Sequence, residues 1–405
     1  MVKEVKIIPK DWKIVQIGDH FDFKNGLNKA KIFFGQGTPI INYMDVYPNP
    51  AIYAKNIHGK VTVSNDEQRA FEIRKGDVLF TRTSETIEEI GLSSVVLDGV
   101  KKTVFSGFLL RARPTTEFFE LEFKKYCFRS NNIRKQIIST SSQTTRALTN
   151  GKLLSKISIL IPIDPQEQLS IAESISNIEQ LIDKFQTIIV KKKNIKEGTI
   201  QELLTGKKRL SGFEKKQGTK LSTLGIIPKD WKTDEIQNHA IITTGKKNTQ
   251  DQIENGEFPF FVRSQKMEKI NTYSYDGEAV LTAGDGDIGK VFHYINAKFD
   301  FHQRVYMISD FDNQLDGYFF YLFFTKNFLK RVMTMTAKST VDSIRMDMIA
   351  KMFVFLPEIK EQIAIGKIIH DMDSEIKELE TKKEKYIMIK NGMMQKLLTG
   401  EIRLT

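Results

Sequence analysis

Two kinds of hydrophobic periodicity alternate along the chain. Short apolar or alternating runs, bounded by Gly, Asn and Asp, predict β-strands. These runs are residues 38–43, 61–64, 76–81, 157–161, 279–282 and 352–356. Between them, residues 118–138 and 318–333 have the composition of helices. Each half of the chain is therefore expected to form a mixed α/β domain with many short strands.

After each mixed segment, the apolar residues follow a spacing that alternates between three and four. The seam positions are Ile178, Ile182, Phe185 and Ile189, and then Met372, Ile376, Leu379 and Tyr386. This spacing is typical of a coiled coil. Each predicted helix spans about 30 residues, roughly 45 Å at the α-helical rise, and Gly206 and Gly400 stand where helix C-caps belong. Such a stripe needs a packing partner. We expect the two helices to pair with each other, the alternative being that each packs on its own domain.

The chain also contains an internal repeat. Ile-Ile-Pro-Lys-Asp-Trp occurs at residues 7–12 and 226–231 and holds both tryptophans. The other repeated pairs are Glu167-Gln168 with Glu361-Gln362, Leu-Leu-Thr-Gly at 203–206 and 397–400, and Arg-Leu at 209–210 and 403–404. The tryptophans lie 219 positions apart but the Glu-Gln pairs only 194. Two modules therefore share a frame and differ in their middles.

This pattern predicts an α+β fold in which two mixed α/β domains are separated by two long antiparallel coiled-coil helices. We place the first mixed domain at residues 1–165 and a central helical spacer at 166–215. The second mixed domain takes residues 216–358, and a C-terminal helical spacer takes residues 359–405.

Composition narrows the class of protein. No apolar run approaches the roughly 18–20 residues of a membrane span, and a single cysteine, Cys127, excludes an internal disulfide framework. Both features predict a cytoplasmic protein without a membrane partner. The formal net charge of +11 favours a polyanionic partner such as nucleic acid, or else reflects a lysine-rich solvated surface.

Motifs for catalysis are weak or missing. Residues 284–290, Gly-Asp-Gly-Asp-Ile-Gly-Lys, match the glycines of nucleotide-binding loops, but a strand-like run follows where those loops need a helix. Asp285 and Asp287 would repel phosphate, so we interpret the segment as a tight turn between strands. The six histidines lack metal-ligand spacing. We therefore expect no catalytic residue, no metal and no cofactor bound by this chain.

Basic and amide side chains recur in both modules, in the types that contact DNA bases and phosphates. The candidates in the first module are Asn28, Lys29, Lys31, Thr81, Arg82, Thr83, Ser84, Gln143, Thr144 and Arg146. Those in the second are Lys246, Lys247, Asn248, Arg263, Gln265, Gln303, Arg304, Ser339, Thr340 and Arg345. Such residues also occur in ordinary soluble loops, so the recurrence of the sets is the stronger signal.

The chain resembles the specificity subunits of Type I restriction–modification enzymes. The resemblance rests on the repeated Pro-Lys-Asp-Trp start, the Gly-Asp-Val-Leu-Phe-Thr-Arg segment at 76–82, the Glu-Gln entry to each helix and the Leu-Leu-Thr-Gly-x-x-Arg-Leu exit. It covers the whole chain. Thr282-Ala283 stands where the first module has Thr81-Arg82, which leaves Arg82 without a direct counterpart.

The resemblance implies a subunit without catalysis of its own. Each mixed domain would read one half of a split duplex DNA target, and the two domains would be related by a pseudo-twofold axis. The helices would set the spacing and dock two methyltransferase subunits, with restriction–translocase subunits as a further class of partner. S-adenosylmethionine, ATP and Mg²⁺ would belong to these partners.

Two alternatives stay open at this point. The chain could be a self-contained DNA-modifying enzyme with an unfamiliar site, which methyl transfer or cleavage by the isolated chain would reveal. It could also be a protein-binding scaffold with two modules, in which the positive charge is incidental.

Overall fold

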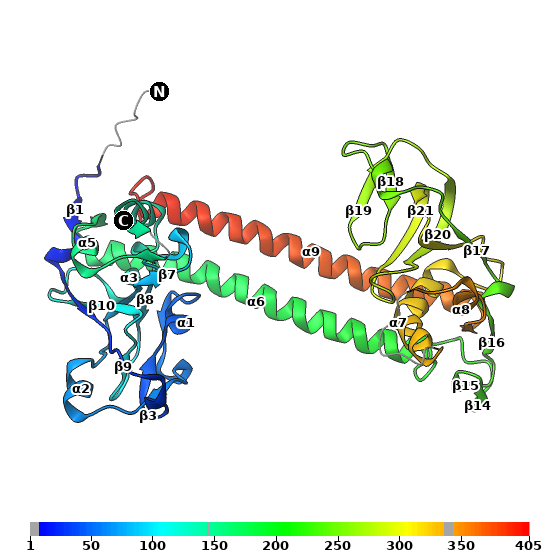
Figure 1. The fold of residues 1–405 in the computed structure, drawn as a ribbon, viewed down its shortest axis with the longest axis horizontal. Helices are drawn as coiled ribbons and strands as arrows, with labels where there is room; N and C mark the ends of the chain where they lie inside the picture. Colours follow the sequence, from blue (N-terminus) through cyan, green and yellow to red (C-terminus); the bar gives the residue numbers. More distant parts are fainter. Residues whose placement is uncertain (1–7, 144–145, 336–342, 405) are drawn as a thin grey trace. The chain divides into compact units, whose positions relative to one another are not determined.

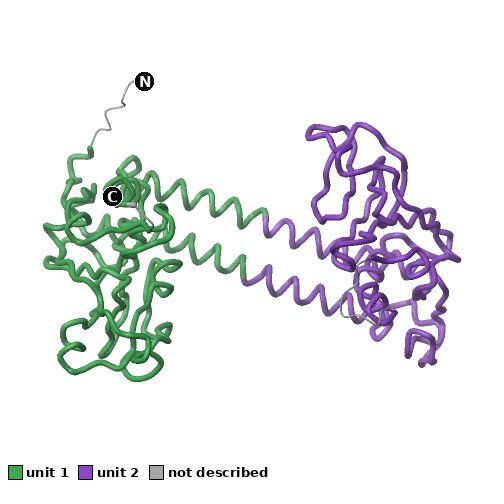
Figure 2. The backbone as a smooth tube through the Cα atoms, in the orientation of Figure 1, with its two compact units in different colours: residues 1–186, 381–405 green, residues 187–380 purple. Residues whose placement is uncertain are grey.

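The computed structural model describes residues 8–143, 146–335 and 343–404. Its contacts divide the chain into unit 1, which is Met1–Gln186 with Thr381–Thr405, and unit 2, which is Thr187–Glu380 (Figure 2). The long helices α6 (Pro165–Leu204) and α9 (Ile359–Leu397) contribute residues to both units. Two mixed α/β domains combined with two long helices confirm the expected fold class.

Unit 1 contains mostly short strands and short helices besides its parts of α6 and α9 (Figure 1). The strands are β1 (Trp12–Gln16), β2 (Phe21–Asn25), β3 (Phe34–Ile41), β4 (Ala51–Ile52), β5 (Lys60–Val61), β6 (Val78–Thr81), β7 (Thr83–Ser84), β8 (Ser93–Val96), β9 (Val104–Phe105), β10 (Leu109–Pro114), β11 (Ser142–Gln143), β12 (Ala147–Leu148) and β13 (Ser158–Pro162). The helices are α1 (Tyr43–Val46), α2 (Asn65–Ala70), α3 (Leu121–Cys127), α4 (Asn131–Thr140) and α5 (Gly151–Leu154).

The main sheet of unit 1 has the order β2-β10-β6-β8-β4, with β10 antiparallel to both β2 and β6. All four residues of β6 are buried, as its uninterrupted apolar sequence predicts for a central strand. Alternate side chains of β6 enter different cores. Phe80 packs with Phe123 and Phe128 beside α3, whereas Leu79 packs with Phe105 on the other face.

Unit 2 has longer strands and one long internal helix (Figure 1). The strands are β14 (Thr219–Ser222), β15 (Gly225–Pro228), β16 (Lys232–Glu235), β17 (Ile241–Thr244), β18 (Phe258–Phe261), β19 (Met267–Ile270), β20 (Tyr275–Ala283), β21 (Phe292–Phe301), β22 (Val305–Ser309) and β23 (Phe353–Leu356). The helices are α7 (Gly317–Met335) and α8 (Met346–Ala350). The main sheet has the order β17-β22-β20-β21-β18-β19. The phenylalanines of α7 pack with Val280 and Ile308 of this sheet.

The structure corrects two details of the expected helices. Residues 118–138 form two helices, because the chain turns at residues 128–130, where the Arg129 guanidinium donates to the carbonyls of Ser93 and Asn49 at 2.6 and 2.8 Å. The long helices have 40 and 39 residues, which exceeds the expected length. The extra turns of α6 begin at Pro165, which the first turn of a helix tolerates, behind a capping Asp164.

Within each unit, the segments of α6 and α9 pair antiparallel. In unit 1, Glu179 pairs with Lys390 at 3.5 Å and Gln186 accepts from Lys383 at 2.9 Å, so one helix advances as the other recedes. The rings of Phe185 and Tyr386 stack between these pairs, with centroids 5.4 Å apart. The seam residues Ile178 and Ile182 also lie in unit 1, one buried and one half-buried.

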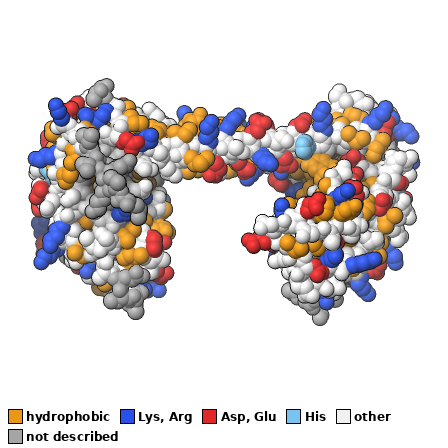
Figure 3. All heavy atoms as spheres, turned by 90° about the horizontal axis from the view of Figure 1, so that it is seen from above, with side chains coloured by type: hydrophobic (Ala, Val, Ile, Leu, Met, Phe, Trp, Pro, Cys, Tyr) orange, Lys and Arg blue, Asp and Glu red, His pale blue; other side chains and the backbone are white. Residues whose placement is uncertain are grey.

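The remaining seam residues lie in unit 2. Ile189 and Ile376 are buried there, while Met372 and Leu379 are half-buried. Charged pairs flank this part of the seam, including Lys196 with Asp373 at 2.6 Å. Cationic and anionic side chains are interspersed over the visible surface of the long helices (Figure 3). In the described part of the chain, no helix combines the length and apolarity needed to cross a membrane.

Candidate nucleic-acid interface

The repeated motifs meet in a buried cluster in unit 1. Glu167, at the start of α6, is 2% exposed and accepts from Trp12 Nε1 at 3.2 Å. It also accepts from Arg403 Nε and Nη2, at 2.6 and 2.8 Å. This pairing raises the pKa of Arg403 above its usual value. Residues from the beginning, middle and end of the chain therefore meet in one cluster. We call this cluster of Trp12, Glu167 and Arg403 the structural frame of unit 1.

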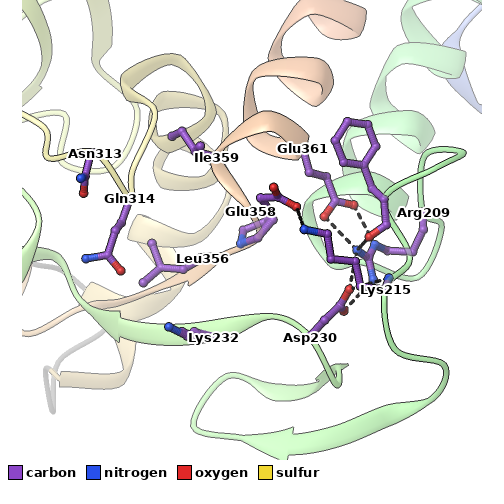
Figure 4. A pocket seen from close by; sticks show the side chains of 12 residues that line it. Arg209, Lys215, Asp230, Lys232, Asn313, Gln314, Leu356, Glu358, Ile359 and Glu361 are labelled. Carbon is purple, nitrogen blue, oxygen red and sulfur yellow. Dashed lines mark hydrogen bonds and ion pairs between the residues drawn. The ribbon is translucent and has the colours of Figure 1, made fainter.

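Unit 2 repeats the same cluster with its own residues, and Figure 4 shows its ion pairs between Arg209, Asp230 and Glu361. Glu361, at the start of α9, accepts from Trp231 Nε1 at 3.1 Å and from Arg209 at 2.7 and 2.9 Å. Arg209 also pairs with Asp230 at 2.8 Å. Burial would lower the pKa of Arg209, but its hydrogen bonds to Glu361 and Asp230 raise it above the usual value. The repeated motifs of unit 2 thus form a structural frame equivalent to that of unit 1.

The two glycines of the helix exits complete this frame. Gly206 and Gly400 have φ of +67° and +70°, the left-handed conformation in which glycine is favoured. A Cβ on Gly206 would lie 2.5 Å from Pro228, and one on Gly400 would lie 2.9 Å from Pro9. The repeated Thr-Gly and Pro-Lys-Asp-Trp segments are therefore matched by close packing.

The DNA-contact candidates lie away from this frame, and in unit 1 several meet at one edge of the main sheet. Gly107 N donates to Leu27 O at 2.8 Å, which brings the loop after β2 beside the loop before β10. Arg82 N donates to Phe108 O at 2.9 Å. The edge thus gathers the half-buried Arg82 and the exposed Asn28 beside Phe108, which is 55% exposed.

A cavity of about 400 Å³ opens at this edge. Its lining residues are Tyr43, Met44, Tyr47, Thr83, Ser84, Glu85, Glu89, Phe108 and Arg146. Glu89 accepts from Tyr47 Oη at 2.7 Å and from Ser84 Oγ at 3.0 Å, and these hydrogen bonds lower the pKa of Glu89. Tyr43, Tyr47 and Glu89 carry no motif. They are revealed only by hydrogen bonds in the folded chain: Tyr43 and Glu89 contact Ser84, and Tyr47 contacts Glu89.

Other candidates of unit 1 are engaged or lie elsewhere. Thr81 is fully buried, and its hydroxyl donates to Glu89 O and accepts from Leu92 N. Lys29 pairs with Glu67 at 2.9 Å, whereas Lys31 is exposed. Gln143 lies in β11, and Thr144 is outside the described residues. These residues stay predictions as DNA contacts.

Unit 2 gathers its candidates at the equivalent edge. Gln303 N donates to Lys247 O at 2.8 Å, and Gln303 Nε2 donates to Asn248 Oδ1 at 2.6 Å. Asp285 pairs with Arg304 at 2.9 Å and with Arg263 at 3.1 Å. Sequence reasoning did not select Asp285, because its role depends on arginines from two other loops.

One buried histidine, His302, contacts the backbone of this edge. His302 Nδ1 accepts from the backbone N of Arg304 at 3.0 Å, and the ring is 4% exposed. Burial, aided by the charge of Arg263, lowers the pKa of His302. A neutral ring keeps Nδ1 available as an acceptor, which fixes the backbone beside Arg304.

The remaining candidates of unit 2 are more dispersed. Gln265 donates to Phe292 O at 3.2 Å, and Lys246 is exposed. Arg345 is exposed at the start of α8. Ser339 and Thr340 are outside the described residues. Among the described residues, no group of three or more His, Cys, Asp or Glu side chains could hold a metal ion.

The strand register corrects the sequence alignment of the two modules. Alignment by sequence pairs Thr81 with Thr282, but their side chains lie on opposite faces of their sheets. Thr81 follows Leu79 into the core that lies away from α3, whereas Thr282 alternates with Leu281 and shares the face of Val280 beside α7.

Backbone hydrogen bonds identify the true counterparts. Arg82 N donates to Phe108 O in unit 1, and Gly284 N donates to Arg304 O at 2.8 Å in unit 2. Gly284 therefore occupies the position of Arg82, and Arg304 occupies that of Phe108. The prediction that Arg82 lacks an arginine at its own position holds. The alignment with Ala283 was wrong by one residue, because both strands are buried on both faces here and their sequences do not show which residues share a face.

Comparison with solved structures finds the same fold at low sequence identity. The S subunit of a Type I restriction–modification system from M. genitalium gives a TM-score of 0.59 at 14% identity, covering 98% of each chain. The HsdS subunit from Thermoanaerobacter tengcongensis gives 0.52 at 14% identity, covering 99% of this chain and 100% of that one.

Sequence comparison points the same way. The MjaVIII specificity subunit of Methanocaldococcus jannaschii is 23% identical over 98% of this chain and 94% of its own length. The putative MjaX specificity subunit of the same organism is 25% identical over 99% of this chain and 96% of its own length. The family model described as Type I restriction modification DNA specificity domain matches residues 9–196 and 228–388. With two such domains in one polypeptide, the chain belongs to this family and is a DNA sequence-recognition subunit of the Type I restriction–modification class.

Proposed function

We propose that unit 1 and unit 2 each read one half of a bipartite duplex DNA target, and that the two half-sites differ in sequence. The supporting observation is the pair of equivalent sheet edges. Their backbone frames correspond, but Phe108 stands in one where Arg304 stands in the other. An aromatic ring and a guanidinium make different contacts with base edges. Two domains with the same backbone scaffold but different side chains at this edge are suited to recognising two different DNA sequences.

We also propose that the chain performs no catalysis and works within a larger complex in the cytoplasm. Its long helices would set the spacing between half-sites and dock two methyltransferase subunits. Seam-flanking charges and exposed apolar residues on these helices, such as Met388 at 67% exposure, are available for such contacts. S-adenosylmethionine, ATP and Mg²⁺ would be used by the methyltransferase subunits and by any restriction–translocase subunits.

Selection from a library of random duplexes tests this function. The chain, purified with its methyltransferase subunits, should enrich one asymmetric motif with two specified halves and an unspecified spacer. Equal binding of all duplexes would contradict the proposal. In the host, the same motif should carry methylated adenine and lose it when the gene is deleted.

Methyl transfer or DNA cleavage by the isolated chain would instead support a self-contained enzyme. The matched control is the methyltransferase preparation without this chain, which should select no motif. These two preparations separate recognition from catalysis.

A further inference from the structure

Three loops of unit 2 converge on one carboxylate at the candidate DNA edge. Asp285 follows β20, Arg263 lies between β18 and β19, and Arg304 lies between β21 and β22. Arg304 Nη1 donates to one carboxylate oxygen at 2.9 Å and Arg263 Nη1 donates to the other at 3.1 Å. One acidic residue therefore holds two arginines side by side.

The backbone fixes this carboxylate from two directions. Gly284 N donates to Arg304 O at 2.8 Å, and Ile344 N donates to Gly284 O at 2.9 Å. Asp285 itself forms a β-bridge with Ser343. The side chain of Asp285 is only 14% exposed, whereas those of Arg263 and Arg304 are 44% and 60% exposed. The carboxylate is thus fixed and mostly buried, whereas the two guanidinium groups that pair with it are more exposed to solvent.

Stability alone is a weak reason for this arrangement. Exposed ion pairs contribute about 0–1 kcal/mol. A carboxylate on a DNA-binding edge also repels phosphate and so weakens sequence-independent binding. The residue is better explained by what it does to the arginines.

Each arginine keeps donors for a second partner. A guanidinium carries five N–H groups, and Asp285 engages only Nη1 of each. Among the described residues, no other side chain or carbonyl within hydrogen-bonding distance accepts from the guanidinium of Arg304. The Nε and Nη2 groups of Arg304, which no described residue engages, can therefore donate in parallel to two acceptors. In the major groove, guanine O6 and N7 offer such a pair, and this contact is the commonest base-specific one made by arginine.

We propose that Asp285 is a positioning residue that orients Arg304, with Arg263 beside it, to read guanine in the half-site of unit 2. This inference rests on the proposed function and adds the class of base. Gln303, next to Arg304, is held by Asn248 at 2.6 Å, so the loop that carries the reading arginine is braced on both sides.

The inference applies to unit 2 alone. In unit 1, the position of Arg304 is taken by Phe108, and that of Asp285 by Thr83. Arg82 instead donates from Nη1 to the carbonyl of Gly107 at 3.4 Å. The carboxylate-held arginine pair therefore accompanies one half-site and not the other.

Duplex selection with variants tests the role of the arginine. Wild-type chain in complex with its methyltransferase subunits should select a motif with a guanine in one half. Arg304→Ala should lower the preference for that guanine by about tenfold or more. Arg304→Lys should lose the same preference while retaining affinity for random duplex, because lysine keeps the charge but lacks the planar fork.

The role of the carboxylate is tested by Asp285→Asn against Asp287→Asn. Asp287 lies in the same loop and pairs only weakly with Lys290, at 3.5 Å, so its variant removes the same charge without touching an arginine. Asp285→Asn should relax the same guanine and leave or raise the affinity for random duplex. Asp287→Asn should leave the guanine preference unchanged.

Chemical replacement of the base provides an independent readout. Duplex with 7-deazaguanine at the relaxed position removes the N7 acceptor and should weaken wild-type binding, with little further loss for Arg304→Ala. A relaxed base other than guanine, no relaxed position, or identical behaviour of the two aspartate variants would overturn the inference. If the wild-type complex selects no two-part motif, the proposed function itself fails. Unfolding of the Asp285 variant would lower affinity for every duplex and shift Trp231 fluorescence, and either result counts against a positioning role.

Discussion

At the scale of single residues, the frame depends on two buried glutamates. Glu167 and Glu361 each bind an indole N–H and an arginine fork, and each is at most 2% exposed. A buried charge is tolerated only when it is paired and hydrogen-bonded. Removing either carboxylate would leave a buried or half-buried guanidinium without its main partner.

Glu361→Ala should therefore destabilise unit 2 by about 3–5 kcal/mol, because Arg209 would keep only Asp230 as a partner. Denaturant unfolding followed by Trp231 fluorescence in a Trp12→Phe background measures this directly, since the chain has two tryptophans. Glu358→Ala, an exposed neighbour at the same helix start, should cost less than about 1 kcal/mol. Equal effects of the two variants would contradict a buried frame.

Cys127 offers a second test at this scale. It is 2% exposed, and burial raises the pKa of its thiol well above the usual value. Because the thiolate is the reactive form, modification by a thiol reagent at pH 8 should be far slower in the native chain than in denaturant. Rapid labelling under native conditions would show that the core around α3 opens readily.

At the scale of elements, the long helices pair along an apolar seam with charged pairs beside it. In unit 1 the rings of Phe185 and Tyr386 stack within this seam, next to the hydrogen bond between Lys383 and Gln186. Aromatic pairs contribute beyond the area that they bury. Exposed charges beside them contribute less and fix the register.

A double-mutant cycle of Phe185→Ala and Tyr386→Ala should give a coupling energy of about 0.5–1.5 kcal/mol in unfolding experiments. The same cycle with Phe185 and the exposed Met388 should give a value near zero. Additive effects of Phe185→Ala and Tyr386→Ala would mean that the rings do not interact in solution.

At the scale of the whole molecule, net charge governs how the chain meets DNA. The formal net charge is +11, and on the face drawn in Figure 3 cationic and anionic side chains are interspersed on both units and on the long helices. Each phosphate neutralised by Lys or Arg adds about 0.9 to the slope of affinity against salt on logarithmic axes. Sequence-independent binding should therefore depend strongly on ionic strength.

Affinity of the complex for duplex DNA should fall about 100-fold or more between 50 and 200 mM salt, which fluorescence anisotropy can follow. Lys246→Ala at the edge of unit 2 should lower the slope by about 1 without changing the selected motif. Lys216→Ala, exposed in the segment after α6, should leave the slope unchanged. An equal loss for both lysines would argue against a localised DNA edge.

The sequence by itself determined the two modules, the long helices and the family. Local sequence patterns suffice for such features, because an apolar stripe or a repeated hexapeptide can be recognised without knowing its contacts in the folded chain. It also selected Arg263, Gln303 and Arg304 as DNA contacts, and the structure brings these residues to one edge of unit 2.

The tertiary structure decided how distant residues combine. It buried Thr81, shifted the alignment of β20 by one residue, and assembled Trp12, Glu167 and Arg403 into one cluster. In the sequence, Asp285 was considered only as a charge that repels phosphate. In the structure, it pairs with Arg263 and Arg304. The physical reason is the same in each case. The register of a strand buried on both faces leaves no local trace in the sequence, and neither do contacts between separate segments, which are 19 positions apart for Asp285 and Arg304 and 236 for Glu167 and Arg403. Only packing of the folded chain specifies them.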